Sequence, residues 1–213
     1  MGQASATRER ILNHGVALAS QSGLEGVTLG TLADDVGMSK SGLFAHFRSK
    51  EAVQVGVLEQ SLIVGAPVVL EPAMREPEGL PRLTAVVRNW FGWAPRAGLP
   101  GGCPVAAGMF EYDDVDGPVR DKLLEMEANW RGVLTTLVQQ AVEKGEFRAD
   151  LDVAQFVWEL SGMYLQHHVA VRFLKAADAD ERAAAAFAAL VERSRASASR
   201  ARRRPAVRRR SRR

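Results

Sequence analysis

The stretch from Thr28 to Lys50, TLGTLADDVGMSKSGLFAHFRSK, constrains the fold more than any other part of this chain. Thr28 is suited to cap a first short helix, which Gly37 ends by adopting a left-handed backbone conformation. Ser39 is suited to cap a second short helix, which carries Leu43, Phe44 and Phe47 on its inner side. Two short helices joined by a glycine bend predict a helix-turn-helix.

The charge of the second helix indicates what this motif can face. From Gly37 to Lys50 there are three basic residues, Lys40, Arg48 and Lys50, and no acid. A phosphate backbone could therefore approach without repulsion. The net charge of +3 for the whole chain is less informative about DNA binding, because it sums two parts of opposite charge. Residues 1–192 carry 17 Lys and Arg against 25 Asp and Glu, a net charge of −8, whereas residues 193–213 carry eleven arginines and no acid.

The rest of the chain is predicted to be helical, so the fold class is all-α. Apolar residues recur at helical spacing, and glycines and prolines separate the segments. We expect helices at residues 7–22, 49–66, 83–91, 104–110, 118–144, 152–175 and 179–194, with a loop between Pro67 and Pro81. The helix after Ser49 follows the motif without a linker, which predicts mechanical coupling between the two parts of the chain.

Two long segments carry a coiled-coil-like seam. In the first, apolar residues alternate at spacings of four and three, at Val119, Leu123, Met126, Trp130, Val133 and Leu137. The second repeats the pattern from Val153 to Leu174. At 1.5 Å per residue each helix is roughly 35 Å long. We expect helices 118–144 and 152–175 to pair with their counterparts in a second subunit, giving a homodimer.

Composition excludes several other classes of protein. The 213 residues are enough for a substantial core, and neither a signal peptide nor an apolar run of membrane-spanning length is evident. We therefore expect a cytoplasmic protein with no membrane partner. The single cysteine, Cys103, cannot form an internal disulfide, and a buried structural thiol is the expected role.

The first four predicted helices, with the motif VTLGTLADDVGMSKSGLFAHFRSKEAV, resemble the TetR family of transcriptional regulators. The resemblance covers about residues 7–60. It implies that the second helix of the motif lies in the major groove, with Lys40, Ser41 and Leu43 near base edges. It also implies phosphate contacts from Thr28, His46 and Lys50, and Ser39 completes the predicted DNA-binding set. Ala45 stands where a tyrosine is usual in the family, which removes one usual phosphate contact.

The same resemblance implies a small-molecule effector. The candidates for a pocket in the C-terminal part are mostly aromatic or sulfur-containing side chains, Trp90, Trp93, Phe110, Met126, Trp130, Met163, Tyr164 and His168. The alternative for each of them is ordinary core packing. His167 and His168 are adjacent and point about 100° apart on a helix, so we expect no metal site there.

These observations together predict a three-part chain. Residues 1–48 form a helix-turn-helix DNA-binding domain, residues 49–195 a helical ligand-binding and dimerisation domain, and residues 196–213 a disordered arginine-rich tail. The predicted function is a repressor released from a pseudo-palindromic operator by a small apolar or aromatic molecule.

Two alternatives stay open. An architectural DNA-binding protein would use the basic tail and need no effector. A helical enzyme is the weaker alternative, because no Ser/His/Asp or Cys/His grouping, phosphate loop or HExxH helix is present, and we expect no catalytic residue, cofactor or metal. The sequence does not identify the effector or the operator, and it does not decide between repression and activation. The role of the tail and any redox role of Cys103 also stay open.

Overall fold

The computed structural model describes residues 3–196, and this part of the chain is helical, as predicted. In chain order the elements are α1 (Gln3–Ser22), α2 (Leu29–Val36), α3 (Lys40–Phe47), α4 (Lys50–Ala73), α5 (Leu80–Trp90), α6 (Trp93–Arg96), α7 (Pro104–Glu111), α8 (Pro118–Glu143), α9 (Val153–Val169), the π-helical turn η1 (Ala170–Leu174) and α10 (Ala179–Ser194). The arginine-rich tail predicted at 196–213 lies outside the described residues beyond Ala196.

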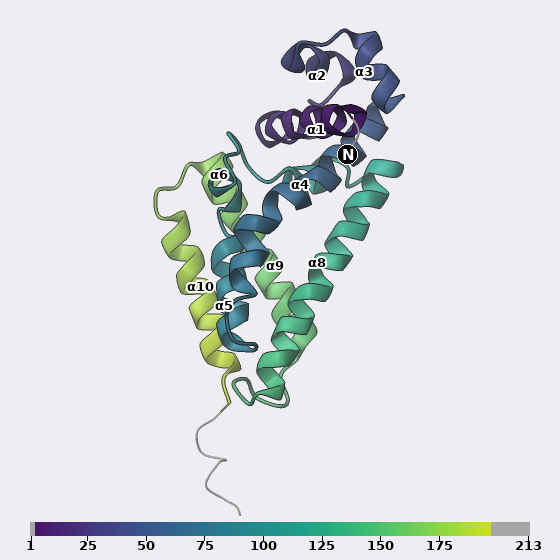
Figure 1. Ribbon diagram of the computed structural model, residues 1–213. Coiled ribbons are helices and arrows are strands. Elements are labelled where there is room, and N and C mark those ends of the chain that lie inside the picture. The colour runs from purple at the N-terminus through teal and green to yellow at the C-terminus, as the bar shows by residue number, and fades with distance from the viewer. Residues whose placement is uncertain (1–2, 197–213) are drawn as a thin grey trace, which may run out of the picture.

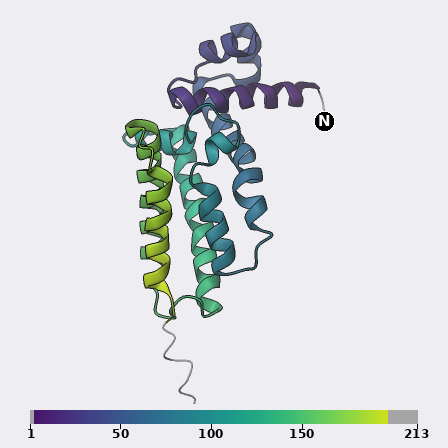
Figure 2. The same cartoon turned by 90° about the vertical axis from the view of Figure 1, so that its left-hand side faces the viewer.

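Helices α1, α2 and α3 form the head, which lies across one end of helices α5 to α10, the body (Figures 1 and 2). The predicted caps are present. The Thr28 hydroxyl accepts from the Thr31 amide at 3.0 Å, and the Ser39 hydroxyl accepts from the Gly42 amide at 3.1 Å. Gly37 ends α2 with φ of 69°. The helix-turn-helix predicted from these residues is therefore confirmed.

Helix α4 connects the head to the body without a break and packs against α1, α5 and α8. The loop predicted from Pro67 onward is wrong at its start, because α4 continues through Pro67 and Pro72 to Ala73. A proline inside a helix removes one backbone hydrogen bond. The carbonyl that Pro67 leaves without its helical partner belongs to Ile63, whose side chain is exposed. Burial of Val69 and Ala73 keeps the last turns helical.

By length and composition alone, α4 is also apolar enough to cross a membrane, which corrects the expectation that no such stretch exists. Half of its most apolar window is buried inside the fold. The two buried glutamines of α4 are bonded to α1 and the turn after it, since Gln54 donates to the Leu24 carbonyl at 2.7 Å and Gln60 donates to Asn13 at 2.8 Å. These contacts are those of a core helix.

The seam predicted on residues 118–144 faces the interior of this chain. Val119, Leu123, Met126 and Leu137 of α8 are buried in the core shared with the other body helices. Helix α9 buries one face in the same core, through Phe156, Val157 and Leu160. Its opposite side leaves Trp158 65% exposed, and Phe173 in η1 is 82% exposed. The periodicity thus identified core helices, and the face without a partner lies on α9 rather than on α8.

Helix α7 and the turn after α1 are joined by a set of hydrogen bonds around Glu25. The backbone amide of Glu25 donates to Glu111 at 2.8 Å, and the hydroxyl of Tyr112 donates to the Glu25 carboxylate at 2.5 Å. Lys50, the first residue of α4, donates to the other carboxylate oxygen of Glu25 at 2.8 Å. Bonding to Lys50, and then to Tyr112, lowers the pKa of Glu25. Burial, followed by the neighbouring Glu25, raises the pKa of Tyr112.

A second joint lies at the end of α1, around Ser20. The Ser20 carbonyl accepts from the Gly102 amide at 2.7 Å and from Arg172 at 3.4 Å, and its hydroxyl accepts from the Gly101 amide at 3.1 Å. A Cβ atom on Gly101 would stand 1.8 Å from the Ser20 carbonyl oxygen, so only glycine fits here. The loop before α7 and the end of α9 are thus both held to α1.

We expect Gly101→Ala to lower the free energy of unfolding by about 1–3 kcal/mol, because the new methyl group must displace the Ser20 backbone. Gly132→Ala is the matched control. Gly132 lies inside α8 with nothing within 4 Å of the added Cβ, so the same change raises stability by up to about 1 kcal/mol through helix propensity. Denaturant unfolding at one protein concentration measures both. Equal effects of the two variants would contradict the close packing at Ser20.

Candidate functional site

The exposed side of α3 carries most of the predicted base-contacting residues. Ser39, Lys40 and Ser41 are exposed around the first turn of the helix. The prediction that Leu43 lies near base edges is wrong. Its side chain is 0% exposed and packs in the core of the head, where it cannot meet a base edge. Its neighbour Phe44, expected on the inner side, is 53% exposed. The order of polar and apolar residues alone did not distinguish these two positions.

The three residues predicted to contact phosphates lie around this helix. Thr28 is half-buried and its hydroxyl is engaged in the cap of α2, while His46 is half-buried near the end of α3. Lys50 is paired with Glu25. Arg48, which was not assigned a role, is exposed and has a positive φ of 57° at the end of α3. From Ser39 to Arg48, exposed side chains therefore present cations and hydroxyls and, through Phe44, one aromatic ring.

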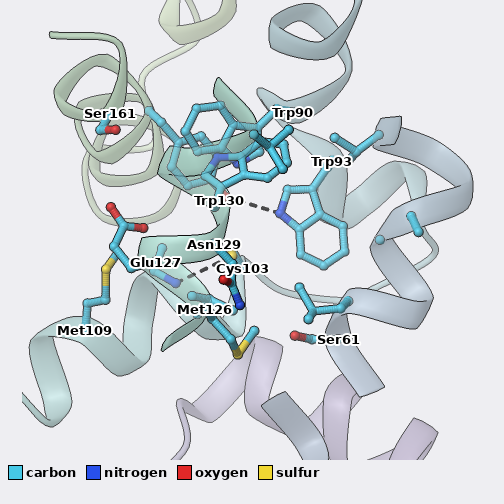
Figure 3. A pocket seen from close by; sticks show the side chains of 18 of the residues that line it. Ser61, Trp90, Trp93, Cys103, Met109, Met126, Glu127, Asn129, Trp130 and Ser161 are labelled. Atoms are coloured by element: carbon cyan, nitrogen blue, oxygen red, sulfur yellow. Dashed lines mark hydrogen bonds between the residues drawn. The ribbon is translucent and has the colours of Figure 1, made fainter. Parts of the chain in front are cut away.

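A cavity of about 360 Å³ lies inside the body, between α4, α7, α8 and α9 (Figure 3). Five of the eight residues proposed from the sequence line it, Trp90, Trp93, Met126, Trp130 and Tyr164. The other three do not. Phe110 is exposed on α7, Met163 is half-buried away from the cavity wall, and His168 lines a different, smaller cavity.

Aromatic rings form one wall of the cavity. Trp90 stacks on Tyr164 with ring centroids 4.0 Å apart, and Trp130 meets Trp90 edge-on at 5.0 Å. The indole of Trp93 donates to the Tyr164 hydroxyl at 3.1 Å. Burial raises the pKa of Tyr164 well above its usual range, so this phenol is neutral and can act as donor or acceptor at neutral pH.

Two polar atoms of cavity-lining residues have no hydrogen-bond partner. They are the indole nitrogen of Trp130 and the hydroxyl oxygen of Ser161, both buried. A buried polar group without a partner costs free energy, and native proteins keep few of them. At the rim, Lys122 on α8 pairs with Glu59 at 3.3 Å and with Glu125 at 2.8 Å. The interior is thus apolar with a few hydrogen-bonding positions, and the charges stay at the edge.

The contribution of α4 to the cavity was missed from the sequence. This helix supplies Ser61, Gly65, Ala66 and Val69 to the lining. Gly65 allows the ring of Trp93 to lie close, since a Cβ there would stand 3.3 Å from the indole. The run of small residues in α4 was the available signal, but it was expected to end at Pro67. Met109 of α7 and Cys103, which is buried as predicted, complete this side.

Within residues 3–196, no group of three His, Cys, Asp or Glu side chains lies close enough together to hold a metal ion. His167 is instead bonded to Asp180 at 2.7 Å and stacked on Phe91.

Comparison with known proteins agrees with this arrangement of head and body. Residues 11–54 match the model of bacterial regulatory proteins of the tetR family, and residues 79–187 match the tetracyclin repressor-like C-terminal domain. The nucleoid occlusion factor SlmA of Cronobacter sakazakii is 33% identical over 134 residues, which are 60% of this chain and 65% of that protein. The match thus spans slightly less than two thirds of that relative.

Solved structures show the same fold at low sequence identity. A TetR-family regulator from Cytophaga hutchinsonii superposes with a TM-score of 0.81 at 18% identity, over 92% of this chain and 98% of that one. AibR, in complex with isovaleryl coenzyme A and operator DNA, superposes with a TM-score of 0.65 at 22% identity, over 86% of this chain and 96% of that one. The helix-turn-helix head and the helical body both match, and this chain belongs to the TetR family of bacterial regulatory proteins.

Proposed function

We propose that this DNA-binding regulator is a ligand-responsive repressor, released from a pseudo-palindromic operator by a small apolar or aromatic molecule. The observation that carries the proposal is the aromatic cavity. Two of its lining residues, Trp130 and Ser161, carry a buried polar atom without a partner, and its helices α4 and α7 both contact the head. Such a protein acts where the DNA lies, in the bacterial cytoplasm.

The walls of the cavity indicate the chemistry of the ligand. Tryptophan, tyrosine, methionine and aliphatic side chains favour an apolar or aromatic body. The indole N–H of Trp130 can donate only, so the ligand would offer it an acceptor such as a carbonyl or ether oxygen. Ser161 can donate or accept. The only cationic side chain in the lining, Lys122, is paired with two carboxylates, so an uncharged ligand suits this site better than an anionic one.

Two helices offer a physical route from the cavity to the DNA-binding surface. Helix α7 lines the cavity through Met109 and is followed by Tyr112, which holds Glu25. Helix α4 lines the cavity through Ala66 and begins at Lys50, which also binds Glu25. A ligand that changes the separation of α4 and α7 would shift both partners of Glu25. For release, the ligand must bind the DNA-incompetent arrangement more tightly than the competent one.

The dimer required for a two-fold operator is best assigned to α9 and α10. Along α9 and η1, the side away from the core carries Trp158, Gly162, Val169 and Phe173 at helical spacing. The neighbouring α10 exposes a row of small residues, Ala184, Ala185, Ala188 and Ala189, which would allow close approach of a second helix. This replaces the pairing expected for 118–144, whose apolar seam is used inside the chain.

A second candidate function rests on the similarity to the nucleoid occlusion factor. A protein of that kind would need DNA binding but no apolar effector, as in the architectural alternative. The cavity with its unpartnered Trp130 and Ser161 atoms favours the effector-dependent function.

The DNA-binding assignment predicts that Lys40→Ala combined with His46→Ala weakens binding to a DNA fragment selected from random sequences by roughly a hundredfold or more. Arg88→Ala, which removes an exposed cation from α5 in the body, is the matched control and leaves binding unchanged. Fluorescence anisotropy at fixed salt measures the affinities, and sedimentation confirms an unchanged oligomeric state. Full binding by the double variant would refute the assignment.

The cavity assignment predicts saturable binding of N-phenyl-1-naphthylamine, an uncharged aromatic probe that fluoresces in apolar surroundings. Ala66→Phe places a ring in the cavity and should abolish the fluorescence increase. Ile63→Phe, on the exposed side of the same helix, should leave it intact. Equal binding by the two variants would place the probe elsewhere and contradict the cavity as a ligand site.

The dimer assignment predicts that Trp158→Glu gives monomers at micromolar concentration, because a charge in an apolar interface is left without a partner. Leu124→Glu changes an exposed apolar residue on α8 and should leave the dimer intact. Light scattering after size-exclusion chromatography distinguishes the two. Dissociation by Leu124→Glu alone would instead support pairing through 118–144.

A further inference from the structure

A second, smaller cavity of about 220 Å³ lies on the other side of the aromatic wall. Its lining shares Trp93, Cys103 and Tyr164 with the larger cavity, so these three residues separate the two spaces. The remaining lining comes from α6, the Gly101–Gly102 loop, the end of α9, η1 and the first turn of α10. Its charged and titratable side chains are Arg96, His167, His168, Arg172 and Asp180. This cavity is more polar than the larger one, and basic side chains outnumber acidic ones in its lining.

The charges in this cavity are not balanced by the protein. Asp180 is the only acid in the lining, and it is bonded to His167 at 2.7 Å. Arg96 donates to the backbone carbonyls of Asn89 and Phe91, which are neutral. Arg172 donates to the neutral Ser20 carbonyl at 3.4 Å. Asp180 also attracts Arg96 electrostatically, so this one carboxylate is shared between His167 and Arg96. Arg172 has no acid in the lining as its partner.

His168 lies close to the positive charge of Arg172. It lies one turn before Arg172, and both side chains approach Gly102, where an added Cβ would stand 2.8 Å from the His168 ring and 3.0 Å from Arg172. Burial, followed by the positive charge of Arg172 and by His167, lowers the pKa of His168. A neutral imidazole at this position can donate a hydrogen bond to an incoming group without a further proton.

The backbone around Arg172 is unusual as well. The α-helix α9 gives way to the π-helical turn η1 at Ala170, and Lys175 follows with a positive φ of 53°. Single π-helical turns are uncommon and are frequent at functional sites, because they turn side chains out of the regular helical positions. Here the irregular turn contains Arg172, the residue that reaches both the cavity and the end of α1.

We propose that the smaller cavity is an anion site that binds a carboxylate or phosphate group between Arg172, His168 and Arg96. Guanidinium groups bind both kinds of oxyanion through paired N–H donors. The site is separate from the apolar effector cavity, and its occupation does not depend on the proposed function. An anion there competes with the Ser20 carbonyl for Arg172. A bound anion therefore weakens one of the bonds that join the head to the body.

The test uses the full-length protein without DNA. Sodium phosphate or sodium acetate is titrated at constant ionic strength while the side-chain resonances of His168 are followed by NMR. We expect a saturable shift and a rise in the pKa of His168, because a nearby anion favours the imidazolium form. The two salts distinguish a phosphate site from a carboxylate site. Absence of a saturable shift with both salts would overturn the proposal.

Variants locate the site. Arg172→Gln should weaken binding of the preferred salt at least tenfold, and Arg88→Gln, the same change on an exposed residue of α5, should leave it unchanged. Arg172→Lys retains the charge without the paired donors and should weaken binding several-fold, which keeps the test decisive if circular dichroism shows that Arg172→Gln is unfolded. Equal weakening by Arg88→Gln, or unaltered binding by both Arg172 variants, would mean that the anion binds elsewhere.

Discussion

The carboxylate of Glu25 joins parts of the molecule that must move together if a ligand in the body is to change the head. One oxygen accepts from Tyr112, which follows α7, and the other accepts from Lys50, which begins α4. Both helices continue into the wall of the larger cavity. A two-point carboxylate of this kind fixes relative position more strictly than apolar packing does, because hydrogen bonds depend steeply on distance and angle. The head is thereby held in one orientation relative to the body.

The larger cavity lowers the stability of the fold relative to a fully packed core. Protein interiors are close-packed, and an empty space among large aromatic residues forgoes the contacts that would fill it. The unpartnered atoms of Trp130 and Ser161 add a further cost. A fold selected for stability alone would have filled the space with larger side chains on α4, where Ser61 and Ala66 stand. Departures of this kind are typical of functional sites.

Local signals in the sequence were sufficient for the head and for most helix positions. Thr28, Gly37 and Ser39 act through their immediate neighbours, so their roles could be predicted without knowledge of the tertiary fold. The seam on α8 was recognised as apolar, but periodicity does not say whether an apolar face meets its own chain or a partner. Pro67 alone predicts a helix end, whereas the packing that keeps α4 helical beyond it is a tertiary effect.

The lining of the larger cavity could be predicted only in part, because the burial of a side chain depends on the tertiary fold. Trp90, Trp93, Met126, Trp130 and Tyr164 gather in one wall, but nothing local distinguishes them from the exposed Phe110. Leu43 and Phe44 are adjacent apolar residues whose exposure depends on how α3 is oriented against α2 and α4. The bonds of Glu25 and Ser20 join residues more than eighty positions apart, to Tyr112 and to Gly101, and no sequence pattern indicates such pairs.

The coupling through Glu25 is tested most directly by a double-mutant cycle on DNA affinity. The affinities of Tyr112→Phe, Lys50→Gln and the double variant are measured for one selected DNA fragment at fixed salt. If Glu25 links Tyr112 to Lys50, the two effects are not additive, and the interaction energy exceeds about 0.5 kcal/mol. Additive effects within that margin would show that Tyr112 and Lys50 act independently, and would contradict the joint between the cavity helices and the DNA-binding surface.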